Sequence, residues 1–159
     1  MIVDSWGRER SQMASLFPGF FHINGLSYLM ETPSWTPSQK ALYRDLFRQS
    51  ESFTDHVWIA SSGSSASVNE SQKLIGLSKA AISIAAQQQN LSLQTRAADR
   101  WAQVLPIYHV GGTMIWARAF QGQFTVIPYP EKKWNPQRFR FWLEQERITL
   151  VSLVPTQIF

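Results

Sequence analysis

The chain has 159 residues, enough for one domain that would bury roughly 70% of the surface of its extended form. Its seven Trp and ten Phe exclude a disordered tail, and a net charge of only +4, scattered along the chain, disfavours nucleic-acid binding. The absence of Cys excludes disulfides, thiolate catalysis and zinc–thiolate sites, and the three His are too dispersed to indicate a metal site.

The amino-terminal residues show no targeting or membrane segment. Charged residues occur in the first ten positions, and the apolar pair Leu16-Phe17 is followed at once by Pro18-Gly19, so no signal-peptide core is present. No uninterrupted apolar run approaches the ~18 residues of a membrane span. We therefore expect a soluble cytoplasmic protein.

Residues 1–55 are predicted to form a β-ribbon followed by a helix. Asn24-Gly25 lies between the short apolar runs of residues 21–29, which favours a tight hairpin. Thr36 can cap, and Pro37 can open, a helix that ends near Gln49. Apolar residues recur on one side of this helix, so we expect that side to lie on a sheet.

Residues 56–159 alternate short apolar strands with longer helices. Strands are predicted at 57–60, 73–77, 101–105, 124–127 and 148–154, and helices at 78–90, 110–121 and 135–147. This alternation predicts an α/β layered domain with a mostly parallel sheet flanked by helices. Ligands of such sheets usually bind beyond the carboxyl ends of the strands.

A serine-rich loop follows the first of these strands. It lies ahead of Lys73 and consists of Ser61, Ser62, Gly63, Ser64 and Ser65. Small hydroxyl residues around one glycine can turn backbone N–H groups and hydroxyls toward a phosphate. A flexible solvated connection is the alternative interpretation.

A second segment follows another strand and consists of Tyr108, His109, Val110, Gly111 and Gly112. It could be a plain turn into a helix, with glycines for backbone freedom. In the functional interpretation, the glycines let a ligand approach the backbone, and Tyr108 and His109 form a wall that is polar on one edge. The usual nucleotide, zinc and serine-hydrolase motifs do not occur.

The order of three segments resembles the acyl-adenylate-forming superfamily of acid–CoA ligases. Residues 61–78 are similar to its phosphate loop, 105–112 to its Leu-Pro-aromatic-His-x-Gly-Gly element, and 151–157 to a segment containing Val-Pro-Thr. Within the superfamily the chain most resembles the o-succinylbenzoate–CoA ligases of menaquinone biosynthesis. The resemblance covers about residues 57–159 and implies part of the large N-terminal domain.

The chain also departs from the family pattern. Ala66 replaces the second loop glycine, Gln72 replaces a proline, and the loop up to Lys73 is longer than usual. Family elements that usually follow, a Tyr-Gly-x-Thr-Glu motif and a C-terminal domain with the catalytic lysine, do not occur in these residues. We therefore expect an N-terminal fragment without its C-terminal lobes, inactive alone, whose uncovered apolar face favours a homo-oligomer.

The resemblance implies adenylation of an aromatic or aliphatic carboxylic acid by ATP and Mg²⁺, followed by transfer to coenzyme A. Ser61, Ser62, Gly63, Ser64, Ser65 and Lys73 would hold the phosphates, and Tyr108, His109, Gly111 and Gly112 would border the acyl pocket. Arg118 could bind a second carboxylate, although a surface charge explains it as well. No catalytic residue or metal ligand is assigned. The alternative is a non-catalytic module that keeps the fold and binds a nucleotide or an acyl group.

Overall fold

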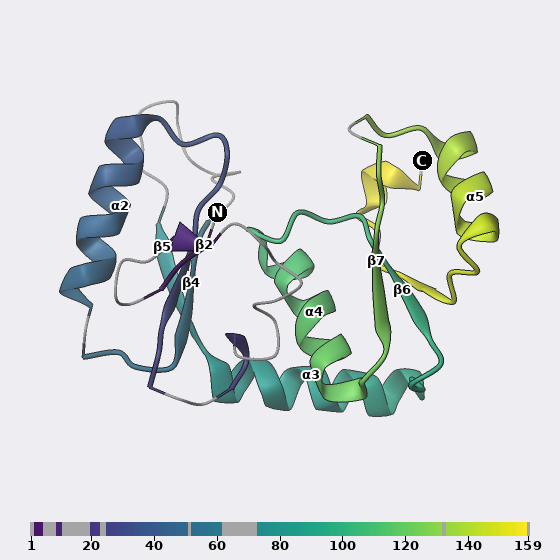
Figure 1. Ribbon diagram of the computed structural model, residues 1–159, viewed down its shortest axis with the longest axis horizontal. Coiled ribbons are helices and arrows are strands. Elements are labelled where there is room, and N and C mark those ends of the chain that lie inside the picture. Colours follow the sequence, from purple (N-terminus) through teal and green to yellow (C-terminus); the bar gives the residue numbers. More distant parts are fainter. Residues whose placement is uncertain are drawn as a thin grey trace.

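Two β-sheets, with helices between and outside them, make up the fold in the computed structural model (Figure 1). The structure describes residues 2–4, 9–10, 20–22, 25–50, 52–61, 73–131 and 133–158. Helix α4 (Val110–Gly122) lies between the two sheets, and α3 (Lys79–Leu93) packs along it and runs beneath both in this view. Helix α2 covers the first sheet from outside, and α5 covers the second.

The first sheet is mixed and has the strand order β2-β1-β3-β4-β5. Its strands are β1 (Ile2–Asp4), β2 (Glu9–Arg10), β3 (Tyr28–Met30), β4 (His56–Ala60) and β5 (Leu74–Ser78). Only β3 and β4 pair in parallel; the other three pairs are antiparallel. The two strands on either side of the serine-rich loop, β4 and β5, thus form an antiparallel pair at one edge of this sheet.

Helix α2 (Pro37–Gln49) begins and ends as the sequence predicts. The Thr36 side chain accepts from the backbone N–H of Gln39, and the Gln39 side chain accepts from the N–H of Thr36, which forms a capping box. Tyr43 and Phe47 are buried against the outer face of the first sheet, so the predicted contact of this helix with a sheet is confirmed.

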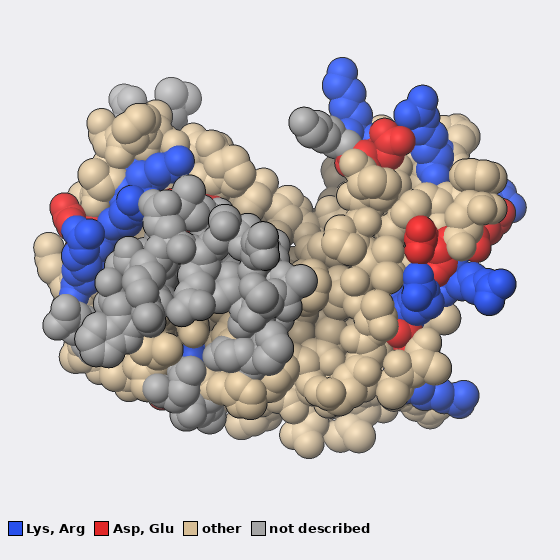
Figure 2. Space-filling model, in the orientation of Figure 1, with Lys and Arg blue, Asp and Glu red and all other residues tan. Residues whose placement is uncertain are grey.

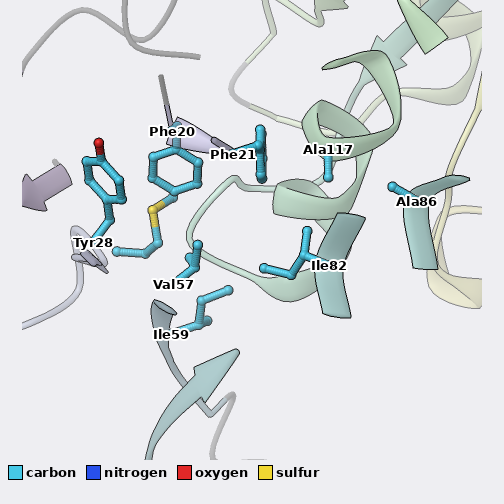
Figure 3. Packing of buried hydrophobic residues seen from close by; sticks show 9 residues of the cluster. Phe20, Phe21, Tyr28, Val57, Ile59, Ile82, Ala86 and Ala117 are labelled. Carbon is cyan, nitrogen blue, oxygen red and sulfur yellow. The ribbon is translucent and has the colours of Figure 1, made fainter. Parts of the chain in front are cut away.

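The inner face of the same sheet packs on α3 and α4 and forms the largest core cluster (Figure 3). Its buried members are Phe20, Phe21, Tyr28, Met30, Val57, Ile59, Ile82, Ala86 and Ala117. These residues come from five separate segments: residues 20–21, β3, β4, α3 and α4. The core therefore depends on contacts between parts of the chain that are far apart in sequence.

The predicted hairpin at residues 21–29 is wrong. Phe20 and Phe21 lie outside any strand, with 0% and 4% of their surface exposed, and β3 pairs with β1 and β4 instead. The Phe20 ring lies 4.6 Å from that of Tyr28. Burial of two phenyl rings outweighs the preference of a local Asn-Gly turn, because each buried ring contributes about 2 kcal/mol or more. Asn24 lies outside the described residues.

The second sheet is wholly parallel, with the strand order β7-β6-β8. Its strands are β6 (Arg100–Gln103), β7 (Thr125–Pro128) and β8 (Leu150–Val151), flanked by α4 on one side and α5 (Pro136–Gln145) on the other. Strand β8 is shorter than predicted, and a 3₁₀ turn (Pro155–Gln157) follows it. The α/β class with flanking helices is confirmed, while the strands are divided between two sheets.

Within the described part of the chain, no helix has the length and apolar character needed to cross a membrane.

Candidate functional site

A cavity of about 660 Å³ lies where the two sheets approach each other. Residues from all three segments that resemble the ligases border it. Its described lining consists of Ile59, Ala60, Ile75, Leu77, Val104, Leu105, Pro106, His109, Val110, Gly111, Val154, Thr156 and Gln157. In Figure 2 the Lys, Arg, Asp and Glu side chains in view lie mainly along the left edge and over the top and right of the molecule, and other residues form the floor of the notch between the two halves.

One wall of the cavity is the antiparallel pair of β4 and β5. Ile59 lies opposite Ile75, and because strand side chains alternate, Ile75 and Leu77 share one face. The pairing continues past the strand ends: the Ser61 N–H donates to the Lys73 carbonyl (2.8 Å), and the Lys73 N–H donates to Ser61 Oγ (3.1 Å). By the same alternation, exposed Lys73 lies at the end of the wall formed by Ile75 and Leu77.

Only the two ends of the serine-rich loop are described. Ser62, Gly63, Ser64 and Ser65 lie outside the described residues, so their contact with phosphate stays a prediction. What the structure adds is the position of the two ends of the loop, Ser61 and Lys73. The loop leaves the sheet at Ser61 and returns at Lys73, directly beside the cavity.

A second wall is the turn that leads into α4. The His109 N–H donates to the Pro106 carbonyl (3.1 Å), and buried Thr113 donates its hydroxyl to the Ile107 carbonyl (2.6 Å). The Thr113 N–H also donates to the His109 carbonyl (3.0 Å). Three hydrogen bonds therefore fix the turn onto the helix and hold His109 at the cavity.

The two glycines of this segment have different surroundings. Gly111 lines the cavity, and a Cβ there would lie 3.0 Å from the flexible Leu105 side chain. At Gly112 a Cβ would lie 2.1 Å from the Pro106 carbonyl oxygen, too close for any residue but glycine. Gly112 thus permits close packing of helix and turn, whereas Gly111 borders the space where a ligand would lie. Tyr108 is absent from the described lining and packs against the first core cluster.

The structure does not bring Arg118 to the cavity. Its guanidinium lies 5.1 Å from the centroid of the Trp101 ring, and burial lowers the pKa of Arg118 below its usual value. Its carbonyl accepts from the Asn90 side chain (2.8 Å), and its Nε has no hydrogen-bond partner among the described residues. Arg118 belongs to the junction of α3, α4 and β6.

Two groups of residues are not predicted by the sequence. The alternation of side chains along β5 indicates that Ile75 and Leu77 share one face of the strand. That this face borders a cavity depends on the turn before α4, which lies far away in sequence. Buried Lys79 had no such signal: its side chain is 0% exposed, and Nζ donates to the His22 carbonyl (2.8 Å) and lies 3.6 Å from Asp55 Oδ1. Desolvation lowers the pKa of Lys79, while Asp55 acts in the opposite direction.

Comparison with solved structures shows the fold. The o-succinylbenzoate CoA synthetase of Bacillus subtilis, in complex with its acyl-adenylate intermediate, matches with a TM-score of 0.55 and 18% identity over 64% of this chain and 25% of that chain. A putative long-chain-fatty-acid CoA ligase of Rhodopseudomonas palustris matches with a TM-score of 0.54 and 17% identity, over 64% and 24%. This chain has the α/β fold of the N-terminal domain of adenylate-forming ligases.

Comparison with protein sequences also finds a CoA ligase. A stretch of 55 residues is 42% identical to a 2-succinylbenzoate–CoA ligase of Staphylococcus aureus, and covers 35% of this chain but only 11% of that ligase. No protein-family model matches the chain. The chain is therefore similar, over part of its length, to acyl-adenylate-forming CoA ligases, with o-succinylbenzoate–CoA ligases among the matches. It spans about a quarter of the solved B. subtilis enzyme.

Proposed function

We propose that this chain carries the phosphate-binding and acid-binding elements of an ATP-dependent acid–CoA ligase. The observation that supports the proposal is the convergence of the three ligase-like segments at one cavity, with Lys73 at the end of its wall. A cation beside an apolar cavity suits a substrate with a charged end that reacts and an apolar end that is bound.

In the proposed reaction the carboxylate of the acid attacks the α-phosphorus of ATP, and pyrophosphate leaves. The CoA thiolate then attacks the acyl carbon and AMP leaves. Lys73, with the serine-rich loop, would hold the leaving phosphates, and the cavity would orient the carboxylate, so the contribution of this chain is positioning and charge stabilisation. Mg²⁺ would arrive bound to ATP oxygens, because the described residues contain no cluster of three His, Asp or Glu side chains.

Among acids, o-succinylbenzoate is the candidate that the names of the relatives support, which would place the protein in menaquinone biosynthesis. Our expectation of a cytoplasmic location also stays a prediction. Arg118 lies outside the lining, so a second carboxylate would need another partner.

Nucleotide binding tests the proposal. We expect the chain to bind ATP with Mg²⁺ in a titration calorimeter, and Lys73→Ala to weaken this binding roughly tenfold, the worth of one charge-assisted contact. Lys133→Ala is the matched control, since Lys133 is also exposed but lies in the other half of the molecule. Equal affinity in wild type and Lys73→Ala would contradict the assigned role.

Turnover is a separate question. The chain has no Tyr-Gly-x-Thr-Glu segment, so we expect no CoA thioester from the 159 residues alone. Mass spectrometry after incubation with acid, ATP and CoA measures this, and thioester formation would refute inactivity while supporting the ligase class.

The alternative is a non-catalytic module that binds an acyl group or a second chain. Ala66 and Gln72, which depart from the family loop, favour it. A chain that binds an acid but no ATP would support this alternative.

Self-association is also proposed. The outer side of α3 carries exposed Ile84 and Leu91, at 61% and 66%, and has no charged residue after Lys79. Two copies could meet there without repulsion between like charges. Sedimentation velocity should show a dimer that Ile84→Arg dissociates; a monomer at all concentrations would contradict this.

A further inference from the structure

We infer that the cavity selects a carboxylic acid whose remaining part is apolar and uncharged, in preference to a dicarboxylic acid such as o-succinylbenzoate. This inference rests on the proposed ligase function, but it disfavours o-succinylbenzoate, the acid that the names of the relatives support.

The composition of the lining is the first observation. Apart from His109, Thr156 and Gln157, every described lining residue is apolar, and none of them is Lys, Arg, Asp or Glu. A volume of about 660 Å³ is in the usual range for a small-molecule site. A ring or an aliphatic chain would gain from burial here, whereas a carboxylate would lose its water without gaining a cation.

The positions of two candidate cations, Arg118 and Lys73, are the second observation. Arg118 lies against Trp101 and outside the lining. Lys73 stands at one end of the β5 wall, where the reacting carboxylate and the phosphates would gather. Neither is positioned for a second carboxylate at the far end of a bound acid.

The polar lining residues form the third observation. Gln157 Oε1 accepts from the Val154 N–H (3.0 Å) and so caps the 3₁₀ turn, while Thr156 offers one hydroxyl. These groups suit a carbonyl or a hydroxyl of the acid. Binding is best compared at pH 8, where histidine side chains are in general uncharged.

Two acids that differ by one group test the inference. 4-Oxo-4-phenylbutanoate is o-succinylbenzoate without the ring carboxylate. We titrate the full 159-residue chain calorimetrically at pH 8 without ATP. We expect it to bind the monocarboxylic acid roughly tenfold more tightly than o-succinylbenzoate, because burying an unpaired carboxylate weakens binding by at least about that factor. Equal or tighter binding of o-succinylbenzoate, or binding of neither acid, would overturn the inference.

A substitution in the wall shows whether this cavity makes the choice. Ile75 lines the cavity and is 46% exposed, so Ile75→Arg adds a cation there without filling a sealed core. We expect it to reduce the preference for the monocarboxylic acid by about tenfold. Leu42→Arg is the matched control, because Leu42 is 50% exposed on α2 and outside the lining. An unchanged preference in Ile75→Arg would overturn the inference.

The two proposals can fail separately. Selective acid binding without any ATP binding would reject the ligase function and keep the selectivity. ATP binding sensitive to Lys73→Ala, combined with tighter binding of o-succinylbenzoate, would keep the ligase and reject the selectivity.

Discussion

Two hollows of this molecule differ in how the chain forms them. The cavity between the sheets takes its lining from β4, β5, the turn before α4 and the 3₁₀ turn, which are far apart in sequence. The second hollow has a volume of about 460 Å³, and its described lining lies within residues 129–145 and includes the exposed ion pair of Arg138 and Glu131 (3.2 Å).

The cavity between the sheets is therefore a feature of the whole fold, whereas the second hollow is a feature of α5 and the strand end before it. Beside the second hollow, Phe139 and Trp142 of α5 pack on Tyr129, and their ring centroids lie 5.2 and 5.0 Å from that of Tyr129. A strand end followed by any amphipathic helix can leave such a hollow. The cavity forms only when four separate segments come together, so it is the better candidate for a functional site. Substitutions should show the same contrast.

Gly112→Ala should have the largest effect. Its Cβ would clash with the backbone of the turn before α4, and we expect a loss of about 3 kcal/mol or more in the free energy of unfolding, measured in urea. Gly111→Ala is the control, since its Cβ meets only the end of the Leu105 side chain, and should cost less than about 1 kcal/mol. Equal effects would contradict the different environments of the two glycines.

Lys79→Ala should have the next largest effect. It removes a buried side chain and leaves Asp55 without this cation, which should cost about 2 kcal/mol, below the range for fully buried pairs because the Asp55 side chain is 21% exposed. Urea denaturation at pH 7 measures it. A cost below about 0.5 kcal/mol would mean that the buried amine contributes no net stability.

The stability of the wild type should also depend on pH through Lys79. Desolvation lowers its pKa in the folded state below the ordinary 10.5, so the unfolded chain binds more protons between those two values. Stability therefore rises with pH through that window. The margin of the wild type over Lys79→Met should widen as the pH approaches 10.5, and a constant margin would contradict a lowered pKa.

Thr113→Val should have a smaller effect. It removes the hydroxyl that donates to the Ile107 carbonyl and leaves that carbonyl unpaired beside the cavity, at a cost of about 1–2 kcal/mol. We also expect weaker acid binding, because the turn that holds His109 loosens. Thr113→Ser keeps the hydroxyl and should retain most of the affinity.

Arg138→Ala should have the smallest effect. The Arg138 side chain is 69% exposed, so loss of its ion pair should change stability by no more than about 0.5 kcal/mol. Acid affinity should not change. A loss of acid binding would show that the ligand occupies the hollow beside α5.

The sequence predicts helix boundaries that depend on neighbouring residues. Helix α2 follows its Thr36 cap and Pro37, and α4 begins at Val110 as expected. Pairings between distant segments were not predictable: the Asn24-Gly25 signal competes with burial of Phe20 and Phe21, and the division into two sheets depends on which strands meet.

The candidate site shows the same limit. His109 and Gly111 were identified because their segment resembles a known motif, and both lie at the cavity. Arg118 was assigned by its charge alone, and its stacking on Trp101 depends on the packing of α4 against β6, which no motif encodes.

The central claim is that one cavity joins the phosphate element to the acid-binding segment. Backbone amide NMR of the ¹⁵N-labelled chain tests it directly, with ATP and Mg²⁺ added first and 4-oxo-4-phenylbutanoate second. We predict that ATP shifts the amides of Ser61 and Lys73, and that the acid then shifts those of Ile75, Leu77 and residues 105–111. Acid-induced shifts confined to residues 129–145, or none at all, would contradict the claim.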